Sequence, residues 1–289
     1  MTDVDGMAVT FVMNLAYMSI DKPEHYSAAE AQAVLDSYGE GGAMSEESGS
    51  EAEEDDTQKE EDLPNIIVMM NESFSDLSVL GDFETNEDYM PFIHSLEQGE
   101  KNTVTGMLNV SVCGGNTANT EFEFLTGNTM AFLPQGSVAY QQYVKSNDYS
   151  IATYLKSKGY DTIAMHPYNA SGWDRDKVYP LLGFDTFYSL KDWVNPVKIR
   201  KYVSDQSCYD KIIELYEQKD ANTPFFLFNV TMQNHSSYSE EYDNFHPDIT
   251  VEGTSSKILP NYLSLIKLSD QALCNLIEYF SKADEDTVI

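Results

Sequence analysis

The 289-residue chain has 48 acidic residues against 17 lysines and arginines, which gives a formal net charge of −31 at pH 7. Nucleic acids are bound through basic surfaces, so this charge argues against a nucleic-acid partner. Hydrophobic residues make up 42% of the chain, enough to fill the core of one large domain or two small ones.

The first 43 residues are predicted to form a helical juxtamembrane segment. The apolar run over residues 7–20 is fourteen residues long, which is too short to span a bilayer. Ser27 is expected to cap a second helix over residues 28–38, which the following glycines end. No signal peptide is visible, because Asp3 and Asp5 stand where its basic residues would be.

Residues 44–62 are predicted to be an acidic, disordered linker. Between Glu46 and Asp62 there are ten acidic residues against one lysine, Lys59, and no large apolar residue. Such a segment cannot bury enough surface to offset the entropy lost on ordering. The alternative is that it collects cations or binds a partner.

From residue 63 onward, apolar runs of strand length alternate with helical patterns. The predicted strands cover residues 66–70, 104–112, 162–165 and 225–231, with another beginning at 287–289. The predicted helices follow the glycines at 114–115 and cover 151–158, 176–182, 205–218 and 260–281. This alternation predicts an α/β fold, a doubly wound and mostly parallel sheet flanked by helices.

Candidate functional residues follow the predicted strands, at the sheet edge where doubly wound folds place their sites. Glu72 and Thr117 follow the first two predicted strands. His166 and His235 follow the next two. We therefore expect these four side chains to lie near one another.

The segment 114–127 starts with two glycines and Asn116 and continues with helical spacing. A glycine turn that leads into a helix presents unpaired N–H groups and the positive end of the helix dipole, which favours an anion. Thr117 lies at this point, and its hydroxyl could attack phosphorus if a cation lowered its pKa. The alternative is that Thr117 only caps the helix, as threonine often does.

Four stretches, read together, resemble the lipoteichoic acid synthase family of extracellular phosphoglycerol transferases, which belongs to the alkaline-phosphatase/sulfatase superfamily. They are residues 64–74, 114–127, 166–176 and 229–235, in the family's order and at similar spacing. The resemblance implies a sulfatase-like catalytic domain over residues 63–289.

The resemblance implies that Thr117 is the catalytic nucleophile, which takes up glycerol phosphate as a covalent intermediate. It implies that Glu72 and Thr117 bind the same cation. A carboxylate and an alkoxide favour Mn²⁺ or Mg²⁺. Glu72 could instead be a surface acid on a loop.

The resemblance also implies that His166, Trp173, Arg175 and His235 line a phosphoglycerol pocket. Arg175 suits phosphate because its planar guanidinium can donate two parallel hydrogen bonds. The alternatives are that Trp173 packs in the core, that Arg175 pairs with a neighbouring aspartate, and that the histidines are structural.

The implied reaction moves glycerol phosphate from phosphatidylglycerol to a growing polymer. The expected partners are therefore the lipid head group and the glycerol-phosphate polymer. The expected place is the extracellular face of the cell membrane, with the parent protein anchored by N-terminal helices that precede this sequence.

The chain departs from the family at its C-terminal end. Family members carry a Gly-Asp-His segment after the last core strand, whereas this sequence stops at Ile289 and contains no Asp-His pair. We therefore expect a C-terminally truncated domain that lacks the last part of its core and two metal ligands. Weak Mn²⁺ binding and no turnover are expected of it.

Other activities remain open on the same scaffold. Sulfatases build their nucleophile from a cysteine in a Cys-x-Pro-x-Arg context, and Cys113 is followed by neither the proline nor the arginine, which counts against a sulfatase. The three cysteines show no metal-binding spacing, and their pairing stays open. The alternatives are a phosphatase, a sulfatase-like hydrolase, a phosphoethanolamine transferase, or an inactive fragment that binds anionic polymer.

Overall fold

The computed structural model describes residues 27–31, 33, 63–99, 102–112 and 114–289. Residues 28–31 and 33 are helical, and the Glu30 N–H donates to Ser27 Oγ at 3.3 Å, so the predicted helix start is confirmed there. The predicted helix over 7–20, the end of the second helix and the acidic linker lie outside the described residues. Residues 63–131 and 138–289 form one compact unit.

A five-stranded parallel sheet lies at the centre of that unit, in the order β3-β2-β6-β1-β7. Its strands are β1 (Asn65–Met70), β2 (Asp161–His166), β3 (Thr186–Ser189), β6 (Phe225–Val230) and β7 (Thr287–Val288). A separate antiparallel hairpin joins β4 (Lys198–Ile199) to β5 (Tyr202–Val203). The predicted parallel α/β sheet is confirmed, whereas β3 and the hairpin were not predicted.

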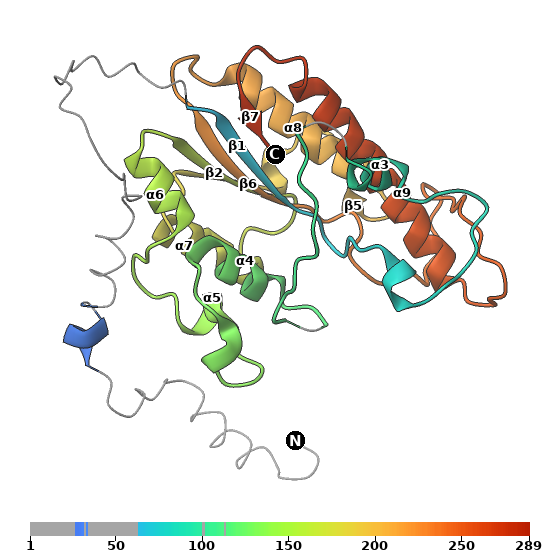
Figure 1. Ribbon diagram of the computed structural model, residues 1–289, viewed down its shortest axis with the longest axis horizontal. Helices are drawn as coiled ribbons and strands as arrows, with labels where there is room; N and C mark the ends of the chain where they lie inside the picture. Colours follow the sequence, from blue (N-terminus) through green and yellow to red (C-terminus); the bar gives the residue numbers. More distant parts are fainter. Residues whose placement is uncertain (1–26, 32, 34–62, 100–101, 113) are drawn as a thin grey trace, which may run out of the picture. The chain divides into compact units, whose positions relative to one another are not determined.

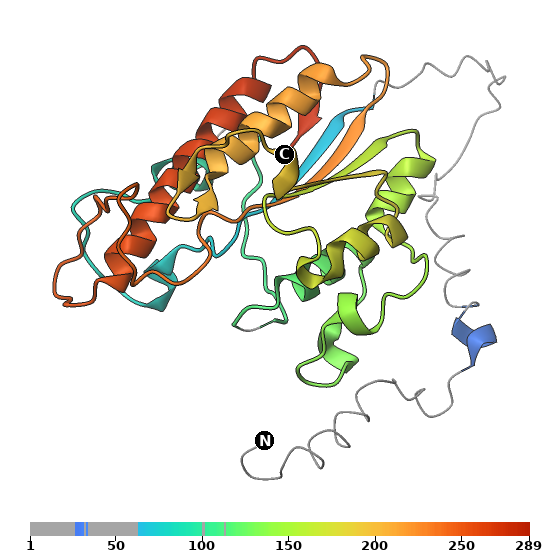
Figure 2. The same ribbon diagram turned by 180° about the vertical axis from the view of Figure 1, so that it is seen from behind.

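Helices cover both faces of the sheet (Figures 1 and 2). On one face lie α4 (Thr117–Thr126), α5 (Ala139–Gln142), α6 (Ile151–Ser157) and α7 (Arg175–Leu181). On the other lie α8 (Asp205–Gln218) and α9 (Ile258–Phe280), with α3 (Pro91–Glu97) beside α9. The 3-10 turns are η2 (Leu77–Leu80), η3 (Met130–Phe132), η4 (Gly172–Asp174) and η5 (Leu190–Asp192). The sheet is therefore doubly wound, as predicted.

Strand β6 shows why the sheet is buried on both faces. Its six residues are all buried, and side chains along a strand alternate between faces. Phe226 and Phe228 belong to the cluster with α4 to α7, whereas Phe225 and Leu227 pack with α8 and α9. A continuous apolar run is what such a central strand requires.

The strand predicted over residues 104–112 is wrong. These residues form no strand, and Val104 and Leu108 are 98% and 82% exposed. A strand needs a partner backbone, and β1 is already flanked by β6 and β7. The apolar residues at 104–112 therefore have no neighbouring strand, within the described part of the chain, with which to form backbone hydrogen bonds.

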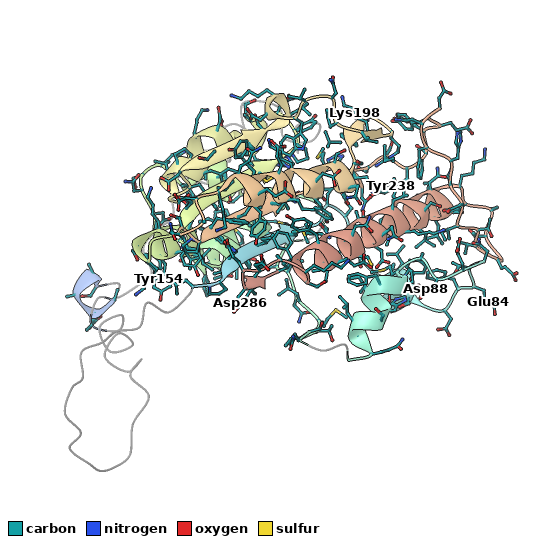
Figure 3. All side chains as sticks on the ribbon, turned by 90° about the horizontal axis from the view of Figure 1, so that it is seen from above. Glu84, Asp88, Tyr154, Lys198, Tyr238 and Asp286 are labelled. Carbon is teal, nitrogen blue, oxygen red and sulfur yellow. The ribbon has the colours of Figure 1, made fainter. Side chains whose placement is uncertain are left out.

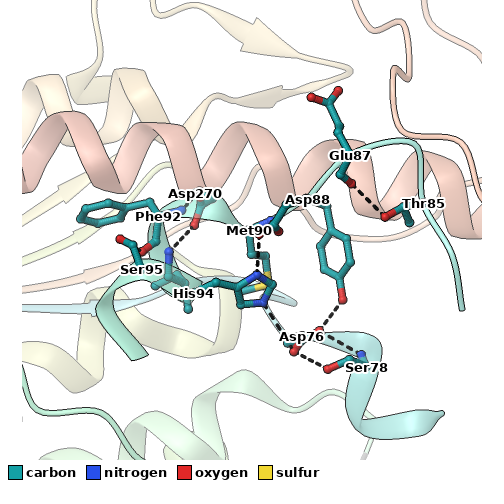
Figure 4. A network of polar contacts seen from close by, with 12 residues as sticks. Asp76, Ser78, Thr85, Glu87, Asp88, Met90, Phe92, His94, Ser95 and Asp270 are labelled. Carbon is teal, nitrogen blue, oxygen red and sulfur yellow. Dashed lines mark hydrogen bonds and ion pairs between the residues drawn. The ribbon is translucent and has the colours of Figure 1, made fainter. Parts of the chain in front are cut away.

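The loop that leaves β1 is fastened to α9 by polar contacts (Figure 4). Both oxygens of the Asp270 carboxylate on α9 accept backbone N–H groups of Phe92 and Ile93 at 2.9 Å, and so cap the start of α3. Closer to β1, Asp76 accepts from the Tyr89 hydroxyl and lies 3.7 Å from His94 Nε2, while His94 Nδ1 is 2.9 Å from Asp88. This His94 cluster (Asp76, Asp88, Tyr89 and His94) holds the loop that follows Glu72.

Two further predictions concern cysteines and the membrane. Cys208 and Cys274 are free thiols, and Cys113 lies outside the described residues. Over residues 27–31, 33, 63–99, 102–112 and 114–289, no helix is long and apolar enough to cross a membrane.

Candidate active site

A pocket of about 650 Å³ opens at the carboxyl edge of the sheet. All six predicted site residues line it, and they come from four separate stretches of the chain: Glu72, Thr117, His166, Trp173, Arg175 and His235. Parallel strands bring their carboxyl ends to one edge, which explains how residues 163 positions apart meet. Their roles remain predictions.

Thr117 is the first residue of α4, and Asn116 occupies the cap position without a side-chain cap bond. The reading of Thr117 as the cap is therefore wrong, and so is the placing of Thr117 after a strand, since residues 104–112 form none. Gly114, Gly115 and Asn116 all have positive φ, which turns the chain into the helix. Thr117 thus lines the pocket at the positive end of α4.

Backbone strain gathers around this pocket. Ser73, Asn116 and Trp173 line it with φ between 50° and 58°, a region that residues other than glycine rarely adopt. Each such residue costs on the order of 1–3 kcal/mol, and such strain is concentrated at functional sites. Trp173 also packs against the α4–α7 core cluster, so it both lines the pocket and supports it.

Glu72 lies two residues beyond β1, in the pocket that also holds Thr117. Its backbone N–H donates to Thr231 Oγ1 at 3.0 Å, and its carboxylate accepts from Ser73 Oγ at 3.0 Å. The first bond ties the Glu72 loop to the end of the neighbouring strand β6. Glu72 is a partly exposed residue of a loop that lines the pocket, so its role as a metal ligand remains a prediction.

His166 ends β2 and is buried. Its Nδ1 lies 2.9 Å from the Val230 carbonyl oxygen, so Nδ1 carries the proton and Nε2 is left as an acceptor. Burial and the charge of Arg175 lower the pKa of His166 to about 3, although the bond to Val230 opposes this. A neutral His166 suits a sugar or glycerol hydroxyl better than a phosphate.

Arg175 lines the pocket but is only 2% exposed, and its guanidinium is paired with the fully buried Glu121 of α4. Its Nε lies 3.2 Å from both Glu121 oxygens, its Nη2 donates to Glu121 Oε1, and its Nη1 donates to the Gly172 carbonyl at 3.3 Å. Burial would lower the pKa of Arg175, but the Glu121 charge raises it. The guanidinium of Arg175, which was expected to bind phosphate, thus pairs with Glu121 and not with a neighbouring aspartate.

His235 lies in the loop after β6, and the buried Arg200 holds that loop. Arg200 donates to the carbonyls of Gln233, His235 and Ser237 at 2.7–2.8 Å. The Tyr202 hydroxyl lies 3.3 Å from His235 Nδ1. Arg200 and Tyr202 were not predicted because they lie on the β4–β5 hairpin, outside every motif.

Other pocket residues could have been found from the sequence. Tyr168 belongs to the His-Pro-Tyr-Asn stretch, and Ser73 and Ser236 directly follow Glu72 and His235. Glu121 lies one helical turn beyond Thr117 in the same motif. Only the pairing of Glu121 with Arg175 required the tertiary structure.

The donors in the pocket are of the kind that a hard divalent cation prefers, a Glu72 carboxylate and a Thr117 hydroxyl. Over the described part of the chain, no group of three or more His, Cys, Asp or Glu side chains could hold a metal. The residues therefore fit Mn²⁺ or Mg²⁺ in type but supply few ligands.

A family model described as Sulfatase matches residues 64–289. The chain belongs to the sulfatase family. Members of this family are typically metal-dependent enzymes. The missing Cys-x-Pro-x-Arg pattern at Cys113 concerns the nucleophile and leaves membership of the sulfatase family unaffected.

Two proteins are similar to this chain in sequence over most of its length. The chain is 36% identical over 231 residues to a Rhizobium meliloti (strain 1021) protein named for cyclic beta-1,2-glucan modification, covering 78% of this chain and 34% of that one. It is 27% identical over 213 residues to lipoteichoic acid synthase 1 of Bacillus subtilis (strain 168), covering 72% and 32%. The chain spans about a third of the length of these relatives.

A solved structure confirms the fold. The Streptococcus pyogenes phosphoglycerol transferase GacH, in complex with sn-glycerol-1-phosphate, superposes with a TM-score of 0.71 at 24% identity. The match covers 93% of this chain and 69% of GacH. The resemblance to the lipoteichoic acid synthases is thus matched in sequence by the Bacillus subtilis relative, and the phosphoglycerol transferase GacH shares the fold.

Proposed function

We propose that this chain carries the nucleophile and the anion-binding pocket of a phosphoglycerol transferase. The observation that carries the proposal is the pocket itself, where all six residues expected from the motifs meet at the start of α4. The name and bound ligand of GacH support glycerol phosphate as the group transferred, in line with the resemblance to the lipoteichoic acid synthases. Phosphatidylglycerol is the proposed donor, outside the cell at the membrane surface.

In the proposed first step, Thr117 gives up its hydroxyl proton to water, and its Oγ attacks the phosphorus of the donor while the bond from phosphorus to the lipid oxygen breaks. The leaving oxygen takes up a proton, for which His235 is the partly exposed candidate donor in the pocket. The oxygen of an acceptor hydroxyl then displaces Thr117 Oγ from phosphorus and gives its proton back to His235, while Thr117 Oγ takes up a proton from water. The positive end of α4 stabilises the negative charge on the phosphoryl oxygens.

Glu72 and Thr117 would hold a divalent cation, Mn²⁺ or Mg²⁺, which supplies Lewis-acid stabilisation of the threonine alkoxide when bound. Neutral His166 accepts a hydrogen bond from a glycerol hydroxyl and so orients the transferred group. Trp173 provides an apolar wall.

Two acceptors are consistent with the relatives. The lipoteichoic acid synthases favour a glycerol-phosphate polymer. The higher identity to the glucan modification protein favours a glycan acceptor. The two share the first step on Thr117 and differ only in the second.

The test is covalent trapping on Thr117 in a form of the protein that includes the Gly-Asp-His segment expected from the resemblance. After incubation with phosphatidylglycerol and Mn²⁺, peptide mass spectrometry should find glycerol phosphate on the peptide that contains Thr117. Thr117→Ala should abolish the adduct, whereas Thr120→Ala, on the same helix but outside the pocket lining, should keep it. An adduct that persists in Thr117→Ala would disprove the nucleophile assignment.

A further inference from the structure

A second, smaller recess adjoins the active-site pocket on the side of the β4–β5 hairpin. It has a volume of about 260 Å³, and Tyr168 lines both cavities. The rings of His166, Tyr168, Tyr202 and His235 form a row with centroid separations of 6.1, 6.4 and 5.5 Å. The recess is therefore about one aromatic ring away from the pocket.

The recess is basic in an otherwise acidic chain. Lys198 and Lys201 line it together with apolar and aromatic side chains, and no acidic residue lines it. Among the described residues, neither lysine forms an ion pair, although Glu240 lies near enough to Lys201 to influence it. At a net charge of −31, an anion is attracted only where basic groups are gathered locally.

The hairpin holds these lysines on a fixed backbone. Lys198 pairs with Val203 across the two strands, and Asn244 Nδ2 donates to the carbonyls of Lys198 and Arg200 at 2.9 and 3.0 Å. Lys201 Nζ lies 5.4 Å from the centroid of the Tyr202 ring. Groups on a fixed hairpin are oriented before a ligand arrives, which lowers the entropy lost on binding.

We propose that this lysine recess (Lys198, Lys201, Tyr168 and Tyr202) binds a second phosphodiester of the substrate while the first lies at Thr117. This inference rests on the proposed transferase function, because it assigns the neighbouring phosphate of the same ligand. The second phosphate comes either from the glycerol-phosphate acceptor or from a neighbouring anionic lipid head group. Both present a phosphodiester beside a polyol, which suits two ammonium groups and a tyrosine wall.

The test compares ligands that carry one phosphate with ligands that carry more. For the unmodified 289-residue chain, calorimetry should give tighter binding of a short glycerol-phosphate oligomer than of glycerol phosphate. The double variant Lys198→Gln, Lys201→Gln should bind the oligomer about fivefold more weakly, which is the scale expected for the loss of two exposed charge pairs. The affinity for glycerol phosphate itself should stay the same.

A matched control removes the same charge elsewhere. Lys145→Gln together with Lys158→Gln also deletes two exposed lysines, and Lys158 lies 5.5 Å from the Tyr154 ring much as Lys201 lies over Tyr202. Figure 3 places Tyr154 far from Lys198 along the molecule. This control should keep the oligomer preference, and an equal loss in both double variants would overturn the recess as a site.

A second arm identifies the source of the phosphate. Binding to phosphatidylcholine vesicles with and without phosphatidylglycerol should depend on Lys198 and Lys201 if the head group is the ligand. Loss in the oligomer arm alone assigns the recess to the acceptor, and loss in neither arm overturns the proposal. If glycerol phosphate fails to bind while a lysine-dependent gain from the oligomer persists, the transferase assignment fails and the recess stands.

Discussion

Two buried arginines flank the pocket and are held in opposite ways. Arg175, 2% exposed, pairs with a carboxylate on α4. Arg200, 5% exposed, donates to backbone carbonyls, lies over the rings of Tyr202 and Tyr238, and leaves its Nε without a partner among the described residues. Glu121 raises the pKa of Arg175, whereas burial lowers the pKa of Arg200. The first arginine ties two helices together by charge, and the second shapes a loop.

The two regions position different parts of the site. Glu121 lies one turn beyond Thr117, so the Arg175 region sets the position of Thr117, the proposed nucleophile. Arg200 bonds the carbonyl of His235 itself, so the Arg200 region sets the opposite wall. Because the two regions position different residues, we expect a substitution in one region to affect only the part of the pocket that this region positions.

The largest expected effect concerns the metal that would lie between the two regions. The described residues offer only Glu72 and Thr117, whereas catalytic sites usually present at least three protein ligands. Each ligand that a Gly-Asp-His segment would add contributes on the order of 2–4 kcal/mol, so we expect these 289 residues to bind Mn²⁺ several orders of magnitude more weakly than a form with that segment. Calorimetry on both forms decides this, and micromolar affinity in this chain would mean that other residues build the site.

Breaking the buried ion pair should be the next largest effect. Arg175→Ala or Glu121→Gln should each lower the free energy of unfolding by about 3–5 kcal/mol, because the partner is left buried and charged. Urea denaturation measures this, with the double change Glu121→Gln and Arg175→Met as the control expected to recover part of the loss. If Arg175→Ala unfolds no more easily but binds glycerol phosphate less well, Arg175 contacts the ligand directly.

Replacing Arg200 should lower the free energy of unfolding by less, and should mainly change the loop that carries His235. Arg200→Ala deletes three hydrogen bonds to carbonyls that water can partly replace, so we expect about 2 kcal/mol of destabilisation. Arg200→Ala and His235→Ala should each lower the affinity for glycerol phosphate. The double variant should lose little more affinity than either single variant. Additive losses would show that Arg200 does not act through His235.

The smallest expected effect is the contribution of protonated His94 to the free energy of unfolding, which depends on pH. Burial opposes protonation of His94, but the hydrogen bond and charge of Asp88, with Asp76, raise the pKa of His94. Since the folded pKa lies above the unfolded value near 6.5, this stabilisation is complete below about pH 6.5 and is lost as pH rises through the folded pKa. It should stay under about 1 kcal/mol because water screens the partly exposed pair.

Denaturation at several pH values, with His94→Gln as the control, measures this contribution. His166 should act in the opposite direction, since its lowered pKa makes folding less favourable as pH falls below about 6.5. A stability that stays equal in wild type and His94→Gln across this range contradicts the role of the His94 cluster.

The sequence by itself determined the elements whose signals are local. The buried run of β6 required a strand between two layers, and Ser150 and Ser204 cap α6 and α8 with their own hydroxyls. It also determined that residues after the strands meet at one edge, because parallel strands share a direction. These inferences need only neighbouring residues and the geometry of a sheet.

Only the tertiary structure decided features that depend on a distant partner. Residues 104–112 have a strand-like composition but no neighbouring backbone to pair with, and α3 starts where Asp270, 178 positions from Phe92, caps it. Arg175 carries the same charge whether it grips phosphate or Glu121, and the packing of α4 against α7 decided for Glu121. A charge or an apolar run states what a residue can bind, and the fold determines which partner comes within reach.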